Sequence, residues 1–289
     1  MKKIVLDFVY GIIFGITQTV PGVSGGTIAI MLGFYEELLD SINNITKDMK
    51  RCLKFLMPLM MGIGVGIVAF SSVISHLLIY HFFVAMAFFI GMIVGIMPPI
   101  YGKIGAIDGK KIALIVLPAV VLIVMAFIST DDVVNPTEVV AGIDAPYMFY
   151  IFLGGMITAA GLIIPGVSGT FFLLMMGIYP VATYSIGSMR FLLEDVTNIP
   201  LIVSILQVLA PLGIGVIIGG LLTARLIDNL LKNYSETVYS IIFGLMIGSV
   251  VALAMDLMPI EESGGTVALA IGALVVGFGI SFVIGKKKI

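Results

Sequence analysis

The chain is poor in charged residues, cysteine and histidine, and it has no tryptophan. Charged side chains make up 11% of its 289 residues, and their formal sum is −2. The single cysteine, Cys52, excludes an internal disulfide. The two histidines, His76 and His81, form no metal-binding pattern and are expected at the membrane interface, so we predict neither a metal site nor a cofactor. No basic patch points to a nucleic-acid partner.

Apolar sequence dominates instead. Hydrophobic residues make up 60% of the chain, and its mean hydropathy is +1.20. A soluble domain has no interior large enough for this much apolar surface. Several apolar runs reach the roughly 18 residues that a helix needs to cross a bilayer. We therefore predict an all-α, polytopic membrane protein, surrounded by membrane lipids.

Two copies of one sequence unit follow each other along the chain. A shift of 144 residues lays PGVSGGTIAIMLGFYEELLDSI (21–42) on PGVSGTFFLLMMGIYPVATYSI (165–186), with ten identities in 22 positions. We predict repeats at 1–130 and 147–289, joined by an outer linker at 131–146. A shift of 153 residues also pairs glycines that are spaced four apart, which indicates close contacts between helices. These pairs are Gly62 and Gly66 with Gly215 and Gly219, and Gly91 and Gly95 with Gly244 and Gly248.

Each repeat is predicted to begin with a broken segment and to continue with three transmembrane helices. The broken segments are 4–42 and 147–186, because a Pro-Gly pair inside an apolar run interrupts a helix. The helices are expected near 55–79, 82–100 and 111–128, and near 203–224, 237–257 and 265–285.

The lysines and arginines indicate how these segments meet the membrane, because cytoplasmic loops are enriched in them. Suppose that each broken segment is a re-entrant hairpin, entering and leaving on one side, and that both termini are cytoplasmic. Then 14 of the 15 basic residues fall inside, and only Arg190 falls outside. Three crossings per repeat turn the second repeat upside down. Inverted repeats with broken helices are characteristic of secondary transporters.

The two Pro-Gly tips carry the features of an anion site. Each tip precedes a helix whose first amide groups lack partners, and a helix N-terminus has partial positive charge. Hydroxyl groups follow each Pro-Gly pair, and the glycines let an oxyanion approach the backbone. We expect the tips to face each other across an internal cavity. The simpler alternative, a kink whose hydroxyls satisfy freed carbonyls, is weakened because the motif occurs in both repeats.

Two further polar residues are candidates for an accessory role. Gln18 lies one turn before the first tip, in an otherwise apolar run. Arg225 is expected to extend to the inner surface, where it is placed to meet a lipid head group.

The stretches VPGVSGGTIAIMLGFYE and IPGVSGTFFLLMMGIY resemble the paired signature of the PopT family of bacterial polyprenyl-phosphate transporters. This resemblance implies a flippase, not an enzyme, that returns undecaprenyl phosphate from the outer to the inner leaflet of the cytoplasmic membrane. The lipid carrier is thereby recycled for peptidoglycan and other envelope polymers. Many members have an acidic residue where this chain has Gln18, so no proton-carrying role is assigned there. The phosphate-binding residues implied by the resemblance are Pro21, Gly22, Ser24, Gly25, Gly26, Thr27, Pro165, Gly166, Ser168, Gly169 and Thr170.

We expect the phosphate to dock at the two tips while the isoprenoid tail stays in lipid and one repeat rocks against the other. An inside-negative potential opposes inward movement of an anion by about 2.3 kcal/mol per charge per 100 mV. Coupling to a proton or a sodium ion is therefore expected. Asp7, Glu36 and Glu37 are the acidic residues nearest the first re-entrant arm, and none of them identifies the ion.

Three other functions stay open from the sequence. A carrier of a small soluble anion would use the same two tips. An intramembrane lipid phosphatase would need histidine, cysteine or metal near the phosphate, and neither histidine nor the cysteine lies near a tip. A passive scaffold held by glycine contacts would leave the hydroxyls at the tips unexplained.

Overall fold

The computed structural model describes residues 2–18, 24–128, 142–189, 191, 197–257 and 263–288. Every element within these ranges is helical and none is a strand, as the sequence predicted. Six of the described helices are long and apolar enough to cross a bilayer, or seven if one bent pair counts as a span. The chain is therefore a multi-pass, all-helical membrane protein.

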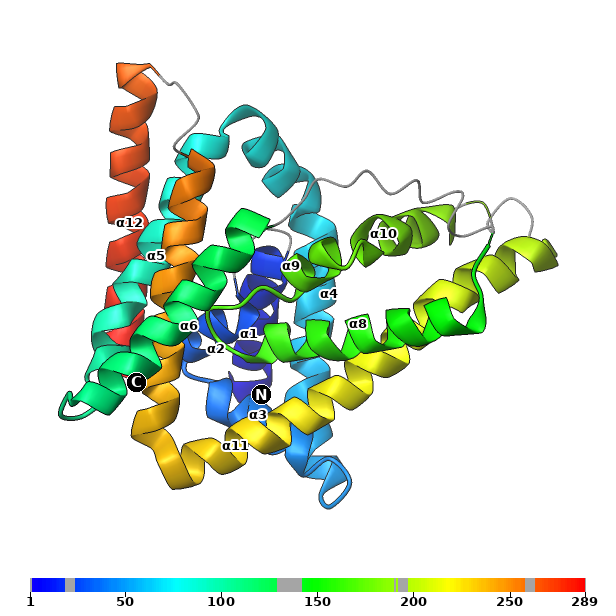
Figure 1. Ribbon diagram of the computed structural model, residues 1–289, viewed down its shortest axis with the longest axis horizontal. Helices are drawn as coiled ribbons and strands as arrows, with labels where there is room; N and C mark the ends of the chain where they lie inside the picture. Colours follow the sequence, from blue (N-terminus) through cyan, green and yellow to red (C-terminus); the bar gives the residue numbers. More distant parts are fainter. Residues whose placement is uncertain are drawn as a thin grey trace. The chain divides into compact units, whose positions relative to one another are not determined.

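The helices follow the same order in both halves of the chain (Figure 1). Two short helices follow the first helix of each half, and long helices come after them. The first half has α1 (Lys2–Gln18), α2 (Gly25–Leu32), α3 (Tyr35–Asn43), α4 (Met49–Tyr80), α5 (Phe82–Tyr101) and α6 (Gly109–Ile128). The second half has α8 (Ala145–Ile163), α9 (Gly169–Met175), α10 (Ile178–Ser188), α11 (Ile199–Leu257) and α12 (Gly264–Lys288).

The element α11 consists of two helices that meet at a kink, where Tyr234 has non-helical backbone (φ −139°, ψ 43°). The two helices predicted at 203–224 and 237–257 are therefore present, but the first continues beyond residue 224 as far as the kink. The polar stretch before this kink stays helical. Lys232 donates to Asp228 one turn earlier at 2.7 Å, an i,i+4 pair that favours the helix.

Two compact units divide the chain. The first comprises Met1–Phe127, Ile164–Val167 and Ala224–Ile289, and the second comprises Ile128–Ile163 and Ser168–Thr223. The first unit therefore includes the turn at 164–167 from the second broken segment. These units follow spatial contacts, whereas the predicted repeats follow sequence similarity, so the repeat boundaries stay a prediction.

Glycines bring α1 against α4 in the first unit and α8 against α11 in the second, in the same way. A Cβ atom added at Gly62 would lie 2.1 Å from the backbone oxygen of Phe8, and one added at Gly215 would lie 2.1 Å from that of Phe152. Phe8 and Phe152 are 144 positions apart, so both halves use the same contact. Small residues allow helices to approach this closely in a membrane.

Inside the first unit, helices from the two halves of the chain also pack against each other in two pairs, α5 with α12 and α6 with α11. Gly91 of α5 lies against Leu274 of α12, and Gly244 of α11 lies against Ile115 of α6. An added Cβ would be 2.1 Å from a backbone oxygen in both cases. Figure 1 shows α5 and α12 side by side. The close contacts predicted for all four glycine pairs are confirmed.

The first broken segment folds back on itself. Near its tip, Phe14 and Gln18 of α1 lie beside Gly25 of α2. Further back, the rings of Tyr10 and Phe34 are stacked with centroids 5.6 Å apart. The chain thus runs along α1 and returns through α2 and α3, whereas the re-entrant hairpin at 4–42 stays a prediction.

The second broken segment has the same form. Gly169 at the start of α9 packs against α8, where an added Cβ would lie 2.5 Å from the carbonyl oxygen of Thr158. Tyr150 of α8 donates from its hydroxyl to the carbonyl of Met176 at 3.0 Å. The axes of α9 and α10 then diverge by 105°. Such a bend fits either a broken span or a re-entrant loop, so the hairpin at 147–186 stays a prediction.

Candidate functional site

The first tip enters α2 through Ser24. This residue has extended backbone (φ −86°, ψ 128°) at the N-cap position, yet its hydroxyl does not cap the helix. The first hydrogen bond of α2 joins the Ile28 N–H to the Ser24 carbonyl at 3.3 Å. The three amide groups between these residues therefore have no acceptor within α2. They belong to Gly25, Gly26 and Thr27.

These amide groups are buried together with their surroundings. All eight residues of α2 are buried, and the exposed fractions of Ser24 and Thr27 are 2% and 3%. A buried donor without an acceptor costs about 1–3 kcal/mol. At a helix N-terminus such donors also add to the positive end of the dipole. The start of α2 is thus a buried position with partial positive charge, and an anion at a helix N-terminus would complement it.

The turn of the second tip contacts the hydroxyls of the first, inside the first unit. Ser24 Oγ donates to the carbonyl oxygen of Ile164 at 3.2 Å, and the Gly166 N–H donates to Thr27 Oγ1 at 2.9 Å. The sequence placed the tips opposite each other across a cavity. In this structure they bond directly at Ser24 and Thr27.

Gly166 meets two separate constraints. Its φ of +87° lies in the left-handed region that favours glycine. A Cβ atom at this position would also lie 2.8 Å from the carbonyl carbon of Leu245 and 2.9 Å from the amide nitrogen of Met246. The buried turn, Pro165 included, is therefore fixed against the part of α11 that follows the kink.

Ser168 begins α9 with the same backbone conformation as Ser24 (φ −90°, ψ 124°). Its hydroxyl lies 2.8 Å from Thr170 Oγ1, within the second unit. Both side chains are partly buried. The second tip thus repeats the hydroxyl pair and the entry into a helix, but its two hydroxyls bond to each other.

The accessory candidates have different surroundings. Gln18 lies beside the start of α2: its amide nitrogen would be 2.6 Å from a Cβ at Gly25, and it donates to the Phe14 carbonyl at 3.4 Å. Arg225 is exposed on α11, and no contact among the described residues joins it to either tip. Two further candidates, Pro21 and Gly22, lie outside the described residues.

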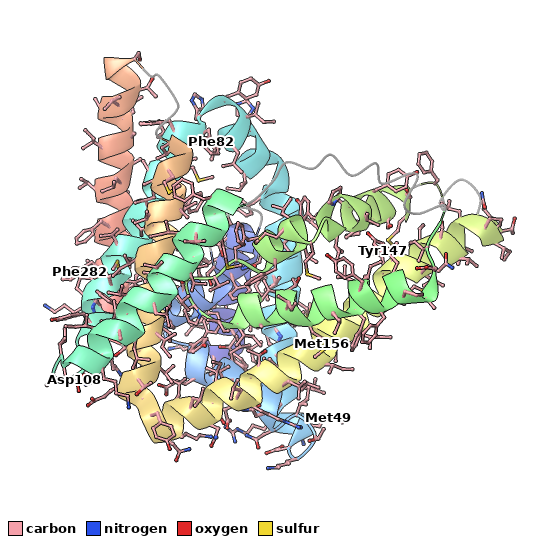
Figure 2. The ribbon with its side chains drawn as sticks, viewed as in Figure 1. Met49, Phe82, Asp108, Tyr147, Met156 and Phe282 are labelled. Atoms are coloured by element: carbon pink, nitrogen blue, oxygen red, sulfur yellow. The ribbon has the colours of Figure 1, made fainter. Side chains whose placement is uncertain are left out.

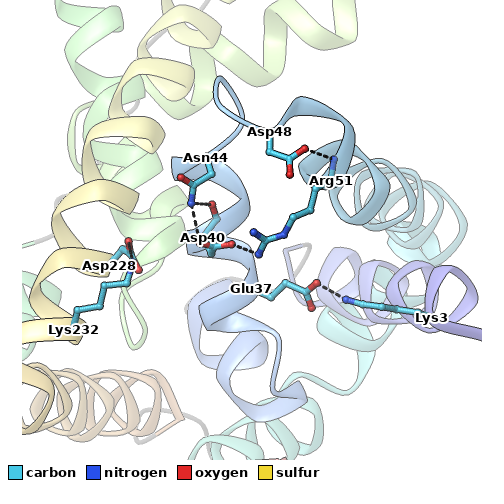
Figure 3. Close-up of polar contacts among 8 residues, drawn as sticks. All are labelled: Lys3, Glu37, Asp40, Asn44, Asp48, Arg51, Asp228 and Lys232. Carbon is cyan, nitrogen blue, oxygen red and sulfur yellow. Dashed lines mark hydrogen bonds and ion pairs between the residues drawn. The ribbon is translucent and has the colours of Figure 1, made fainter.

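Charged residues gather at the other end of the first hairpin (Figure 3). Lys3 pairs with Glu37, and Arg51 donates to Asp40 at 2.6 Å. A cleft of about 290 Å³ between α3 and α11 is lined by Glu36, Leu39, Asp40, Asp228, Leu231 and Lys232. In Figure 2, Met49 and Asp108 lie toward this end of the first unit and Phe82 lies at the opposite end.

The Phe82 end holds the two histidines. His81 precedes Phe82, and the His76 ring lies 4.5 Å from the ring of Tyr80. Across the part of the chain that the structure describes, no three histidine, cysteine, aspartate or glutamate side chains are grouped to hold a metal ion.

Sequence reasoning missed two features of this region. The bonds between the tips join residues about 140 positions apart, and no local pattern indicates them. Burial of Asp7, which is 4% exposed, was also missed. The available signal was that Asp7 is the only charged side chain between Ile4 and Tyr35.

Comparison with known proteins gives concordant matches. Residues 14–262 match the model of a family described as undecaprenyl phosphate translocase-like. A Staphylococcus aureus protein named polyprenyl-phosphate transporter is 27% identical over 286 residues, which cover 97% of this chain and 96% of that protein. A Vibrio cholerae protein of the same name is 28% identical over 257 residues, covering 84% and 75%. No solved structure matches. The family and both relatives are named for transport and not for an enzymatic reaction.

Proposed function

The chain belongs to the undecaprenyl phosphate translocase-like family, and on that premise we propose that it moves undecaprenyl phosphate from the outer to the inner leaflet of the bacterial cytoplasmic membrane. The lipid carrier is thereby recycled for peptidoglycan and other envelope polymers. The names of two relatives that cover most of this chain support the choice of substrate.

One observation carries the proposed site: three buried amide groups at the start of α2 have no acceptor in their helix. The phosphate of the lipid supplies oxygen acceptors and negative charge at this position. Ser24 and Thr27 add hydroxyl groups, and Gln18 adds an amide beside Gly25. At Gly25 the missing side chain leaves room for the Phe14 ring and the Gln18 amide beside the start of α2.

The phosphate is proposed to compete with the hydrogen bonds that join the two tips. In our proposal the phosphate takes over the Gly166 N–H from Thr27 and frees the hydroxyl of Ser24 from Ile164. The tips then separate, and Ser168, Gly169 and Thr170 supply the same groups from the second side. The isoprenoid tail stays in lipid throughout.

The proposed movement uses the two repeats, 1–130 and 147–289, as inverted halves that rock against each other. The recurrence of one glycine contact, Gly62 on Phe8 and Gly215 on Phe152, supports a common fold for both halves. Both hairpins are re-entrant in this proposal. Both termini and the charged end of the first unit face the cytoplasm, because cytoplasmic loops are enriched in lysine and arginine.

Inward movement of the phosphate needs an energy source. The inside-negative potential opposes it by about 2.3 kcal/mol per charge per 100 mV. A proton or a sodium ion that enters with the lipid offsets this cost. The transporter is therefore proposed to run on one of these two gradients.

The test is transport in liposomes that contain the purified protein. A labelled polyprenyl phosphate is followed between leaflets under an imposed pH or sodium gradient, for wild type and for Ser24→Ala/Ser168→Ala. Wild type should move the lipid, and the double variant should lose at least 90% of that activity. Ser185→Ala is the control, because Ser185 is equally buried but donates to Val181 in its own helix.

Two results would contradict the proposal. Folded wild-type protein that moves no lipid above empty liposomes rules out the function. Inhibition of lipid movement by inorganic phosphate at low concentration points instead to a carrier of a small soluble anion at the same tips.

A further inference from the structure

The first helix of the chain carries one acidic side chain within its apolar run, and this side chain is buried. Asp7 is 4% exposed and is the only charged residue between Ile4 and Tyr35. No described residue donates a hydrogen bond to its carboxyl group. A buried carboxyl group without hydrogen bonds is stable only if it is neutral or faces a cation.

Asp7 is separate from the proposed phosphate site. It lies 11 residues before Gln18 on the same helix, which is about 16 Å along the axis at roughly 1.5 Å per residue. The phosphate mechanism therefore gives no reason for a buried acid at this position. In a membrane protein such a residue points to a functional role by default.

The groups that face Asp7 are one lysine and one glutamate. Lys3 precedes it by one turn on the same face of α1, and Glu37 approaches from α3. The neighbouring surface of α4 is apolar or glycine, with Phe55, Leu59 and Gly62 against α1.

Lys3 thus lies near two carboxyl groups, that of the buried Asp7 and that of the more exposed Glu37. In the structure its ammonium group binds Glu37 (Figure 3), and the side chains of Lys3 and Glu37 are 60% and 40% exposed. Asp7 has little water and no bonded cation, so its neutral form is compatible with the arrangement observed. If Asp7 loses its proton, its carboxylate competes with Glu37 for Lys3.

We propose that Asp7 is the coupling residue of this transporter and that it carries a proton. This inference rests on the proposed function. With Asp7 neutral, Lys3 ties α1 to α3 at the base of the first hairpin. Loss of the proton draws Lys3 toward Asp7 and loosens that tie, while the other end of the same hairpin carries the first tip. The charge state of Asp7 thereby biases the separation of the tips.

The surroundings of Asp7 favour a proton over a sodium ion. Transporters hold sodium with several oxygens, commonly carbonyls of unwound backbone. Asp7 lies within the regular helix α1, whose carbonyls are engaged in its own hydrogen bonds. Among the described residues, the other carboxyl group that faces Asp7 is that of Glu37, which is bound to Lys3. A single carboxyl group is enough for a proton.

The experiment compares wild type, Asp7→Asn and Asp40→Asn in liposomes. Movement of a labelled polyprenyl phosphate is followed with a pH gradient, with a sodium gradient and with neither, while a trapped dye reports internal pH. Asp40 is the matched control, since it lies on α3 and binds Arg51 at the same end of the hairpin. We expect a pH gradient to stimulate wild type and Asp40→Asn. In Asp7→Asn the stimulation should fall at least tenfold, together with proton uptake.

Each outcome decides between the two proposals. Equal stimulation of Asp7→Asn and wild type by the pH gradient overturns the role of Asp7 and leaves the transport function standing. If a sodium gradient stimulates wild type and a pH gradient does not, the coupling ion is not a proton. No lipid movement by wild type rejects the function, and the role of Asp7 falls with it.

A second variant covers the case in which Asp7→Asn does not fold. Asp7→Glu keeps a carboxyl group but moves it by one methylene. It should retain stimulation by the pH gradient, with the pH at half-maximal rate shifted by at least about half a unit. A profile identical to that of wild type contradicts the proposal, because a merely structural carboxyl group would leave the profile unchanged.

Discussion

Gly33 and Gly177, which are 144 positions apart, break the return arms of the two hairpins with the same left-handed backbone. Their φ values are 74° and 65°. Gly33 separates α2 from α3, and Gly177 separates α9 from α10. Glycine adopts this conformation without steric cost. The sequence repeat is therefore also a repeat of backbone conformation, as the matching angles of Ser24 and Ser168 show.

The contact between α1 and α4 predicts a sharp difference between two glycines on one helix. Gly62→Ala places a methyl group 2.1 Å from the backbone oxygen of Phe8, which forces the helices apart and should cost about 1–3 kcal/mol. Gly64→Ala meets nothing within 4 Å and should leave stability unchanged. Thermal unfolding followed by circular dichroism in detergent measures both. Equal melting temperatures for the two variants would contradict the contact.

The left-handed turn at Gly166 predicts a second loss of stability. Gly166→Ala combines a positive φ with a methyl group 2.8 Å from the backbone of Leu245, and should cost at least about 1–3 kcal/mol. Gly213→Ala is the control, because it lies in α11 with open space around it. Melting temperatures and the yield of folded protein provide the comparison. A Gly166→Ala protein as stable as the control would show that this turn is not fixed.

The bond between Thr27 and Gly166 predicts opposite outcomes for two substitutions at Thr27. Thr27→Val keeps the shape but leaves the buried Gly166 N–H without its acceptor, at a cost of about 1–3 kcal/mol. Thr27→Ser keeps the hydroxyl and should stay within about 1 kcal/mol of wild type. The melting temperatures of the two variants, measured without denaturant, test this difference in stability. In liposomes, Thr27→Val should also move polyprenyl phosphate more slowly than Thr27→Ser, a difference that a purely structural role would not require.

Two ion pairs of the first unit predict that the loss of stability on replacing a lysine depends on how deeply that lysine is buried. The side chain of Lys111 is 14% exposed, and its ammonium group binds both Glu236 and the Ile104 carbonyl. Lys111→Met should therefore destabilise the protein by about 1–3 kcal/mol, because it leaves these acceptors unpaired. Lys232→Met removes a lysine that is itself 64% exposed, in an i,i+4 pair with Asp228, and should change stability by less than about 0.5 kcal/mol. The opposite ranking in thermal unfolding would exclude this explanation.

Much of the fold follows from local sequence. Apolar run length predicts the long helices, and glycines spaced by four predict their contacts, since both effects depend on residues close together in the chain. The interruptions between α1 and α2 and between α8 and α9 follow from Pro-Gly pairs inside apolar runs. The break between the two helices of α11 lies at Tyr234, later than predicted, because the polar residues that follow Arg225 suggested a loop and instead continue the first helix.

The sequence predicts which residues form the tips of the candidate site but not which groups they bond to. Hydroxyls and glycines after each Pro-Gly pair identify the tips, but the partner of each group depends on the tertiary fold. Ser24 bonds to Ile164 and Thr27 to Gly166 because the second turn packs into the first unit, which no periodicity reveals. The burial of Asp7 likewise depends on tertiary structure, since α4 packs against α1.

The pairing of α5 with α12 has a consequence for how the protein is made. Helix α5 ends at Tyr101 and its partner begins at Gly264. At about 5–20 residues per second, the ribosome needs roughly 10–30 s to produce the intervening chain. During that interval Gly91 of α5 lacks the helix, α12, that packs against it in the finished protein. Insertion of α5 into the bilayer and assembly of the first unit are therefore separate events, and the contact of α5 is completed only after α12 has been synthesised.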